Sequence, residues 1–179
     1  GVSINGAGTG LNGIRILSAL SVSVENVTVD GMTSHGISVE SNLSPKITVV
    51  DSTFRGNTGN GINTFVTTGT VNLSVADAVF SSNNIGINLS GSTKATVRDS
   101  SMVNNLTGVT ASNADIGVFH CLVSGNSTGF SALAGGNIRL SDNMITSNTT
   151  GLSISGGVIA SFGNNMINAN TTDGAPNAF

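Results

Sequence analysis

A glycine followed by an apolar residue recurs along the whole chain, and this repeat constrains the fold more than any other feature. The copies lie 21 to 25 residues apart and begin at Gly13, Gly36, Gly61, Gly86, Gly108, Gly129, Gly151 and, more loosely, Gly174. A second column of apolar residues keeps the same period, at Val24, Val49, Val75, Val97, Val118, Leu140 and Phe162. Such a period is typical of a solenoid, in which each repeat is one coil stacked on the next.

Each repeat contains short runs of alternating apolar residues, such as Val22 with Val24 and Ile87 with Leu89, which predict strands. Between the runs lie Asn, Asp, Gly and Ser, which form tight turns. Stacked coils bring identical positions above one another at about 4.8 Å, so a column of asparagines is expected to form a hydrogen-bonded ladder. That column comprises Asn57, Asn83, Asn105, Asn126, Asn148 and Asn170.

These columns predict an all-β fold, a single parallel β-helix of about eight coils with 21–25 residues each. We expect one domain over residues 1–179, with an incomplete first coil at 1–19 and a C-terminal tail at 171–179. The chain begins with Gly1, without Met, inside strand-like sequence. We therefore expect a mature or trimmed chain whose open first coil is preceded by further coils or covered by a partner.

The pattern apolar-x-Asp-Ser-x-apolar-x-x-Asn-x-x-Gly-Ile, with a good copy at residues 49–57, resembles the right-handed parallel β-helix repeat proteins. This pectate-lyase-like superfold includes pectate lyases and polygalacturonases, and the resemblance covers the whole chain. Residues 161–176 resemble the last coil and tail of secreted bacterial members of unassigned function. The resemblance implies a right-handed helix and an extracellular or cell-surface location, but fold alone does not imply an activity.

The composition excludes several classes of function. Only 8% of the 179 residues are charged, and six Lys and Arg against nine Asp and Glu leave no basic surface for nucleic acid. No apolar run approaches the length of a membrane span. The single cysteine, Cys121, rules out an internal disulfide framework and a cysteine-rich zinc site. We expect its thiol to be buried and unreactive.

One column gives the candidate catalytic residues, because stacking places His120 between Asp99 and Asp142 at about 5 Å from each. Neighbouring carboxylates favour the imidazolium form. Arg98 and Arg139 lie close in sequence. An acid, a base and a cation together suit a polysaccharide lyase or a glycoside hydrolase.

The same column also has two other interpretations. In the first it is a solvated turn ladder, in which each Asp caps N–H groups of its turn and His120 donates to a neighbouring carboxylate. In the second the stacked carboxylates of Asp51, Asp77 and Asp99 bind a cation such as Ca²⁺. Regular spacing along a rod does not build a six-oxygen cage, so we predict no cofactor and keep calcium as the alternative.

Motifs of the resembling enzymes are mostly missing. Ser34-His35-Gly36 matches two residues of the polygalacturonase Gly-His-Gly, Thr171-Thr172-Asp173 is a poor Asn-Thr-Asp, and Asp-Asp and Arg-Ile-Lys are absent. His35 is therefore interpreted as a loop residue. Trp and Tyr are also absent, which disfavours a high-affinity sugar groove, and the phenylalanines at 54, 80 and 162 are predicted to lie in the core.

Two outward columns are candidate contact surfaces. One is polar and comprises Ser38, Asn63, Asn88, Thr110, Ser131 and Ser153. The other is apolar in three consecutive coils, at Leu122, Met144 and Met166, with Phe119 near the first. This stripe either contacts a protein, including a second copy of the chain, or is covered by a loop or by the tail that ends in Phe179.

We therefore interpret the chain as a non-enzymatic secreted or surface protein. It offers a rigid polar contact surface to protein or polysaccharide. The alternative is a polysaccharide lyase or glycoside hydrolase with its chemistry near His120.

Overall fold

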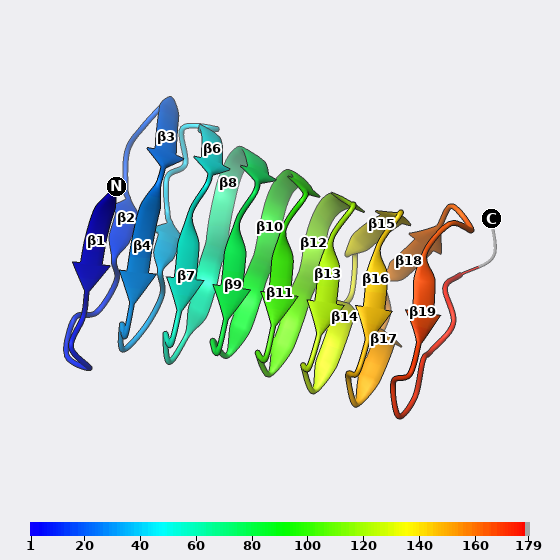
Figure 1. Ribbon diagram of the computed structural model, residues 1–179. Coiled ribbons are helices and arrows are strands. Elements are labelled where there is room, and N and C mark those ends of the chain that lie inside the picture. The colour runs from blue at the N-terminus through cyan, green and yellow to red at the C-terminus, as the bar shows by residue number, and fades with distance from the viewer. Residues whose placement is uncertain (178–179) are drawn as a thin grey trace.

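Alternating apolar residues and turn-forming Asn, Asp and Gly produce a stack of parallel strands (Figure 1). The computed structural model describes residues 1–177, and every strand pair in it is parallel. One sheet has eight strands, one from each coil. In spatial order they are β1 (Val2–Asn5), β4 (Val27–Asp30), β7 (Thr53–Arg55), β9 (Val79–Ser81), β11 (Ser101–Val103), β13 (Leu122–Ser124), β16 (Met144–Thr146) and β19 (Met166–Asn168). The predicted parallel β-helix of about eight coils is confirmed.

The other sheet has eleven strands and supplies two faces of the rod. We call the eight-stranded sheet the third face. The first face contains β2 (Ile14–Ile16), β5 (Ile37–Val39), β14 (Thr128–Ala132) and β17 (Thr150–Ile154). The second contains β3 (Ser21–Glu25), β6 (Lys46–Val50), β15 (Asn137–Ser141) and β18 (Val158–Ser161). Both faces share β8 (Asn60–Ala76), β10 (Ile85–Arg98) and β12 (Thr107–Phe119), each of which runs as one continuous strand from the first face to the second.

The apolar columns fill the interior of the rod. In the second face Val49, Val75, Val97, Val118 and Leu140 pair in register and are completely buried. In the third face the rings of Phe54 and Phe80 stack with their centroids 5.3 Å apart. A single hydrophobic cluster therefore runs through the coils.

Glycine recurs at the start of the first face because the coils approach closely there. A Cβ on Gly86 would lie 2.6 Å from the carbonyl oxygen of Gly108 in the next coil. Gly108 meets the oxygen of Gly129 in the same way. Any larger residue would have to push two coils apart, which explains why this column is the most regular in the sequence.

The predicted asparagine ladder is present and buried. Asn126 Oδ1 accepts hydrogen bonds from the backbone N–H and the side-chain amide of Asn105, at 2.9 and 3.2 Å. Its own amide donates to the Met102 carbonyl at 3.0 Å and to Asn148 Oδ1 at 2.9 Å. The same pattern repeats at Asn83 and Asn148, so each coil satisfies the turn of its neighbour.

The column of acidic residues and His120 forms the corner between the second and third faces. Its members share a left-handed backbone with φ between 49° and 56°, and they are Asn26, Asp51, Asp77, Asp99, His120 and Asp142. Asn, Asp and His are the side chains that tolerate this conformation best. The backbone of the corner therefore accounts for the composition of the column.

Two predicted positions in the last coil were wrong by one residue. Leu140 pairs with Ser161, not with Phe162, and Phe162 is 59% exposed. The chain takes one additional residue to reach the next corner, with Gly163 at a φ of 84°, and this turns the Phe162 side chain outward. Likewise the Asp173 carbonyl, not that of Gly174, accepts the Leu152 N–H, so Asp173 occupies the eighth glycine position.

The described part of the tail closes the last coil along the first and second faces. Thr172 bridges to Thr150, and Asn177 bridges to Ala160. Asn177 Oδ1 also accepts the Ile159 N–H at 2.8 Å. Phe179, which was considered as a cover for the apolar stripe, lies outside the described residues.

Within residues 1–177, no helix is long and apolar enough to cross a membrane. Cys121 is buried as predicted, and its thiol donates to the Phe119 carbonyl at 3.1 Å. Burial raises the pKa of this thiol to about 11, which leaves it protonated and unreactive at neutral pH.

Candidate functional site

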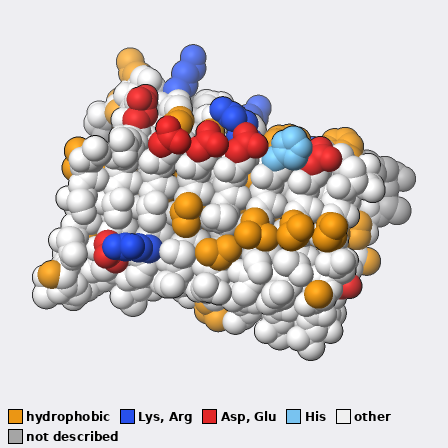
Figure 2. Space-filling view, viewed as in Figure 1, with side chains coloured by type: hydrophobic (Ala, Val, Ile, Leu, Met, Phe, Trp, Pro, Cys, Tyr) orange, Lys and Arg blue, Asp and Glu red, His pale blue; other side chains and the backbone are white. Residues whose placement is uncertain are grey.

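Three of the five candidate catalytic residues lie together at the corner that follows β10 and β12. Asp99 Oδ2 accepts a hydrogen bond from Arg98 Nη1 at 2.8 Å. Its other oxygen, Oδ1, lies 3.8 Å from His120 Nδ1. The His120 side chain is 69% exposed, so the cluster stands at the surface in a row with the other corner acids (Figure 2).

The remaining two candidates have other partners. Asp142 Oδ1 accepts from the Asn164 amide at 2.9 Å, and its Oδ2 accepts from the Ser141 hydroxyl at 3.0 Å. His120 does lie between Asp99 and Asp142 in the corner column. Within residues 1–177 its ion pair is with Asp99, and none joins it to Asp142. Arg139 points from the second face and pairs with Asp115 at 3.8 Å.

Each corner acid belongs to a different coil and faces solvent. Asp51, Asp77 and Asp99 are all exposed. Across the described residues, no three side chains among His, Cys, Asp and Glu converge to hold a metal ion. The arrangement is thus a row of single carboxylates without a cage of oxygens, which leaves the calcium interpretation without support from geometry.

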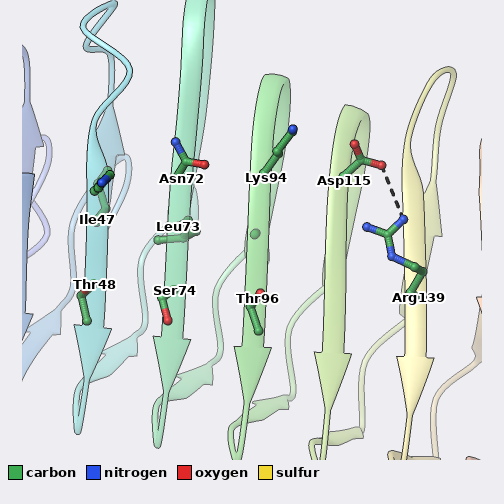
Figure 3. Close-up of a pocket in the computed structure, with 11 residues that line it drawn as sticks. Ile47, Thr48, Asn72, Leu73, Ser74, Lys94, Thr96, Asp115 and Arg139 are labelled. Atoms are coloured by element: carbon green, nitrogen blue, oxygen red, sulfur yellow. Dashed lines mark ion pairs between the residues drawn. The ribbon is translucent and has the colours of Figure 1, made fainter. Parts of the chain in front are cut away.

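A hollow lies on the second face, whose strands lead into this corner. It has a volume of about 560 Å³ and crosses β6, β8, β10, β12 and β15 (Figure 3). Its polar lining residues are Lys46, Thr48, Asn72, Ser74, Lys94, Thr96, Asp115 and Arg139. We call it the second-face groove.

The groove owes its shape to the register of these strands. Lys46, Asn72, Lys94 and Asp115 pair across successive strands and form one wall. Two positions later along each strand, Thr48, Ser74 and Thr96 form the floor, and their short side chains leave the face hollow. This groove was not predicted because its wall changes from Lys46 to Asn72, Lys94 and Asp115 in successive coils, so no repeated residue type marks it in the sequence.

Phe119 ends β12 on the second face and lies on the other side of the corner from the apolar stripe. Gly117 follows Thr96 in the floor row, and a Cβ on it would lie 2.8 Å from Cε2 and Cζ of Phe119. The ring therefore folds back over Gly117 and is half-buried there. Only glycine leaves space for the ring at this position.

A second hollow, of about 320 Å³, lies on the first face near the N-terminus and is lined in part by Arg15, His35 and Glu40. Arg15 makes two hydrogen bonds to Glu40, at 2.9 and 2.7 Å. These bonds, with one from Ser38, lower the pKa of Glu40 to about 2. The predicted polar column runs through this face, but Ser38 and Thr110 are buried and its other members are half-buried.

His35 holds adjacent coils together. Its Nδ1 accepts the backbone N–H of Asn60 at 3.0 Å, which requires a neutral imidazole. One coil earlier, Asn12 Oδ1 accepts the His35 N–H in the same way. Burial lowers the pKa of His35, and the charge of Glu40 opposes this to a smaller extent.

Stability should therefore depend on pH through His35. A histidine whose folded pKa is depressed stabilises the fold fully above its unfolded pKa of about 6.5, and this contribution falls as pH drops below that value. We expect the urea midpoint to decrease between about pH 7.5 and pH 5, and to decrease less in His35→Asn, which keeps an acceptor as at Asn12. An equal decrease in both proteins would contradict this role. The exposed His120 is common to both and serves as the internal control.

The predicted apolar stripe lies on the third face and is exposed. Leu122 pairs with Met144 and Met144 with Met166 in successive strands, and their exposed fractions are 38%, 44% and 51%. Figure 2 shows this row of hydrophobic side chains parallel to the row of corner acids. The described tail pairs with the first and second faces, so it does not cover the stripe.

The model of a protein family described as periplasmic copper-binding protein (NosD) matches residues 63–178. No curated protein and no solved structure matches the chain.

Proposed function

Because the chain belongs to the periplasmic copper-binding protein (NosD) family, we propose that it is a non-enzymatic β-helix protein of the periplasm or cell surface. In this proposal the second-face groove is a rigid contact surface for a polysaccharide. The observation that carries it is the hollow of about 560 Å³ that crosses five neighbouring strands.

The lining of the groove supports a polymeric ligand with hydroxyl groups. Successive strands present a hydroxyl or an amide at the same register position. In the floor of the groove these groups are the hydroxyls of Thr48, Ser74 and Thr96. These groups repeat at the strand spacing of about 4.8 Å, along the axis of the rod. Because the backbone ladder fixes them, binding an extended chain requires little ordering of the protein.

The family name raises the question of copper, and the donor set of this chain does not fit a copper site. His35 and His120 lie on different faces, and the Cys121 thiol is buried and protonated. Met144 and Met166 are paired thioethers on the third face, but two soft donors without an imidazole or thiolate make an incomplete set. We therefore derive no step that involves copper.

A polysaccharide lyase or glycoside hydrolase is the alternative function. Its support is the exposed cluster of Arg98, Asp99 and His120 at the corner between the second and third faces. Against it, Asp142 and Arg139 are held by other partners. Release of reducing ends or of an unsaturated product from any polysaccharide, lost in His120→Ala, would replace the proposed function with this one.

The test is a binding titration of purified protein with neutral and acidic polysaccharide oligomers. We expect at least one to bind the wild-type protein and to bind Ser74→Trp at least tenfold more weakly, because the indole would fill the floor of the groove. The matched control is Ser101→Trp, which adds the same ring to β11 on the third face. Equal loss in both variants would contradict the assignment of the groove.

Absence of binding by every oligomer would overturn the proposed function. The same samples should then be examined by sedimentation. A dimer of the wild-type protein that Met144→Ser converts to a monomer would identify the apolar stripe as the contact surface, with a second copy of the chain as partner.

A further inference from the structure

We propose that the second-face groove selects anionic polysaccharides, with Lys46 and Lys94 each binding a charged group of the chain. This inference rests on the proposed function and specifies its ligand. The two lysines stand in the same wall of the groove, because Asn72 pairs with Lys46 on one side and with Lys94 on the other. Figure 3 shows Asn72 and Lys94 side by side on neighbouring strands. Their register places the side chains two strand spacings apart, about 10 Å along the rod.

Charge distribution is the first reason. The chain is acidic overall, with six Lys and Arg against nine Asp and Glu. Yet three of the six cations, Lys46, Lys94 and Arg139, line this one groove. Elsewhere Arg15, Arg55 and Arg98 pair with carboxylates at 2.7 to 3.2 Å. Within residues 1–177, by contrast, neither lysine has a carboxylate within ion-pair distance.

The neutral groups between the cations are the second reason. Asn72 stands between the two lysines, and the floor below carries three hydroxyl groups. Ammonium groups bind carboxylates or sulfates as point charges, while amides and hydroxyls bind sugar hydroxyls. A row that alternates cation, amide and cation therefore fits a saccharide chain that carries both kinds of group.

Phe119 and Arg139 extend this surface toward the C-terminal coils. The Phe119 ring lies over Gly117, between the floor row and the corner. Arg139 is held at 3.8 Å by Asp115, the one carboxylate that lines the groove. This carboxylate would repel an anionic ligand and occupies a cation that the ligand could use, so it lowers affinity in the wild-type protein.

Matched ligands and variants test the inference. Alginate oligomers carry carboxylates, and the same oligomers reduced at their carboxyl groups are the neutral control. Dextran sulfate and dextran test sulfates in the same way. We expect the anionic member of at least one pair to bind at least tenfold more tightly, and less tightly at high salt. Lys46→Gln and Lys94→Gln should each weaken binding roughly fivefold.

Two further variants separate this explanation from general charge effects. Arg55→Gln removes one positive charge from the third face and should leave affinity unchanged. Asp115→Asn should strengthen binding about threefold, because it removes a repulsive charge and releases Arg139, a gain that a damaged fold would not produce.

Equal binding of the charged and reduced oligomers would overturn the inference and leave the proposed function standing. Equal weakening by Arg55→Gln and the lysine variants would also overturn it, because affinity would then follow net charge. Failure of all four oligomers and of the neutral panel would overturn the proposed function itself.

Discussion

Phe80→Ala is expected to lower the free energy of unfolding by about 4 kcal/mol. The ring is completely buried and stacks on Phe54 with an interplanar angle of 12°. It also lies beneath the glycine column, since a Cβ on Gly61 would come within 2.6 Å of its Cδ1. The surrounding coils are fixed by their backbone ladders, so they cannot collapse into the cavity.

Urea unfolding followed by circular dichroism measures this loss. Phe65→Ala is the matched control, because Phe65 is 62% exposed and its removal should change stability by less than about 0.5 kcal/mol. A loss below about 1 kcal/mol for Phe80→Ala would mean that the stacked rings do not organise the core.

Asn126→Ala is expected to cost about 3 kcal/mol, although it removes little volume. The side chain makes four hydrogen bonds, and its loss leaves the Asn105 N–H and the Met102 carbonyl buried without these partners. The penalty arises from desolvated polar groups, so it should be similar at other central positions of the ladder.

Asn84→Ala provides the comparison, since Asn84 is exposed and only its backbone takes part in the hydrogen bonds between coils. We expect its unfolding midpoint to remain within error of the wild-type value. If Asn126→Ala also left the unfolding midpoint unchanged, the ladder would be a consequence of stacking and not a source of stability.

The repeat allowed the fold to be predicted because stacking places the same steric and hydrogen-bonding constraint on equivalent positions of every coil. Gly86 must avoid the carbonyl of the next coil, and Asn105 must satisfy the turn of its neighbour. The period therefore appears in the sequence wherever the constraint is steric or involves buried hydrogen bonds. Phe162 and Gly174 were misplaced because the last coil departs from this spacing by one residue.

The candidate site was harder to predict, for two physical reasons. The corner column resembled a catalytic or metal site because it contains Asp and His. Its left-handed backbone, however, favours those residues without any ligand. The groove, in contrast, is formed by residues that differ from coil to coil, such as Lys46, Asn72 and Lys94. Periodicity reveals the residues that all coils need for packing and turns. The groove, however, is formed by side chains that differ between coils, so periodicity does not reveal it.

The varying length of the coils has a consequence for how such a chain can change. Between equivalent strands the register advances by 26 residues from Thr53 to Val79 but by 21 from Ser101 to Leu122. The additional residues are absorbed between the columns, and each coil returns to the same glycine and asparagine positions. Insertions and deletions can thus accumulate in one coil without disturbing the next. The exposed side chains can change in one coil at a time while the buried columns that stabilise the rod stay the same.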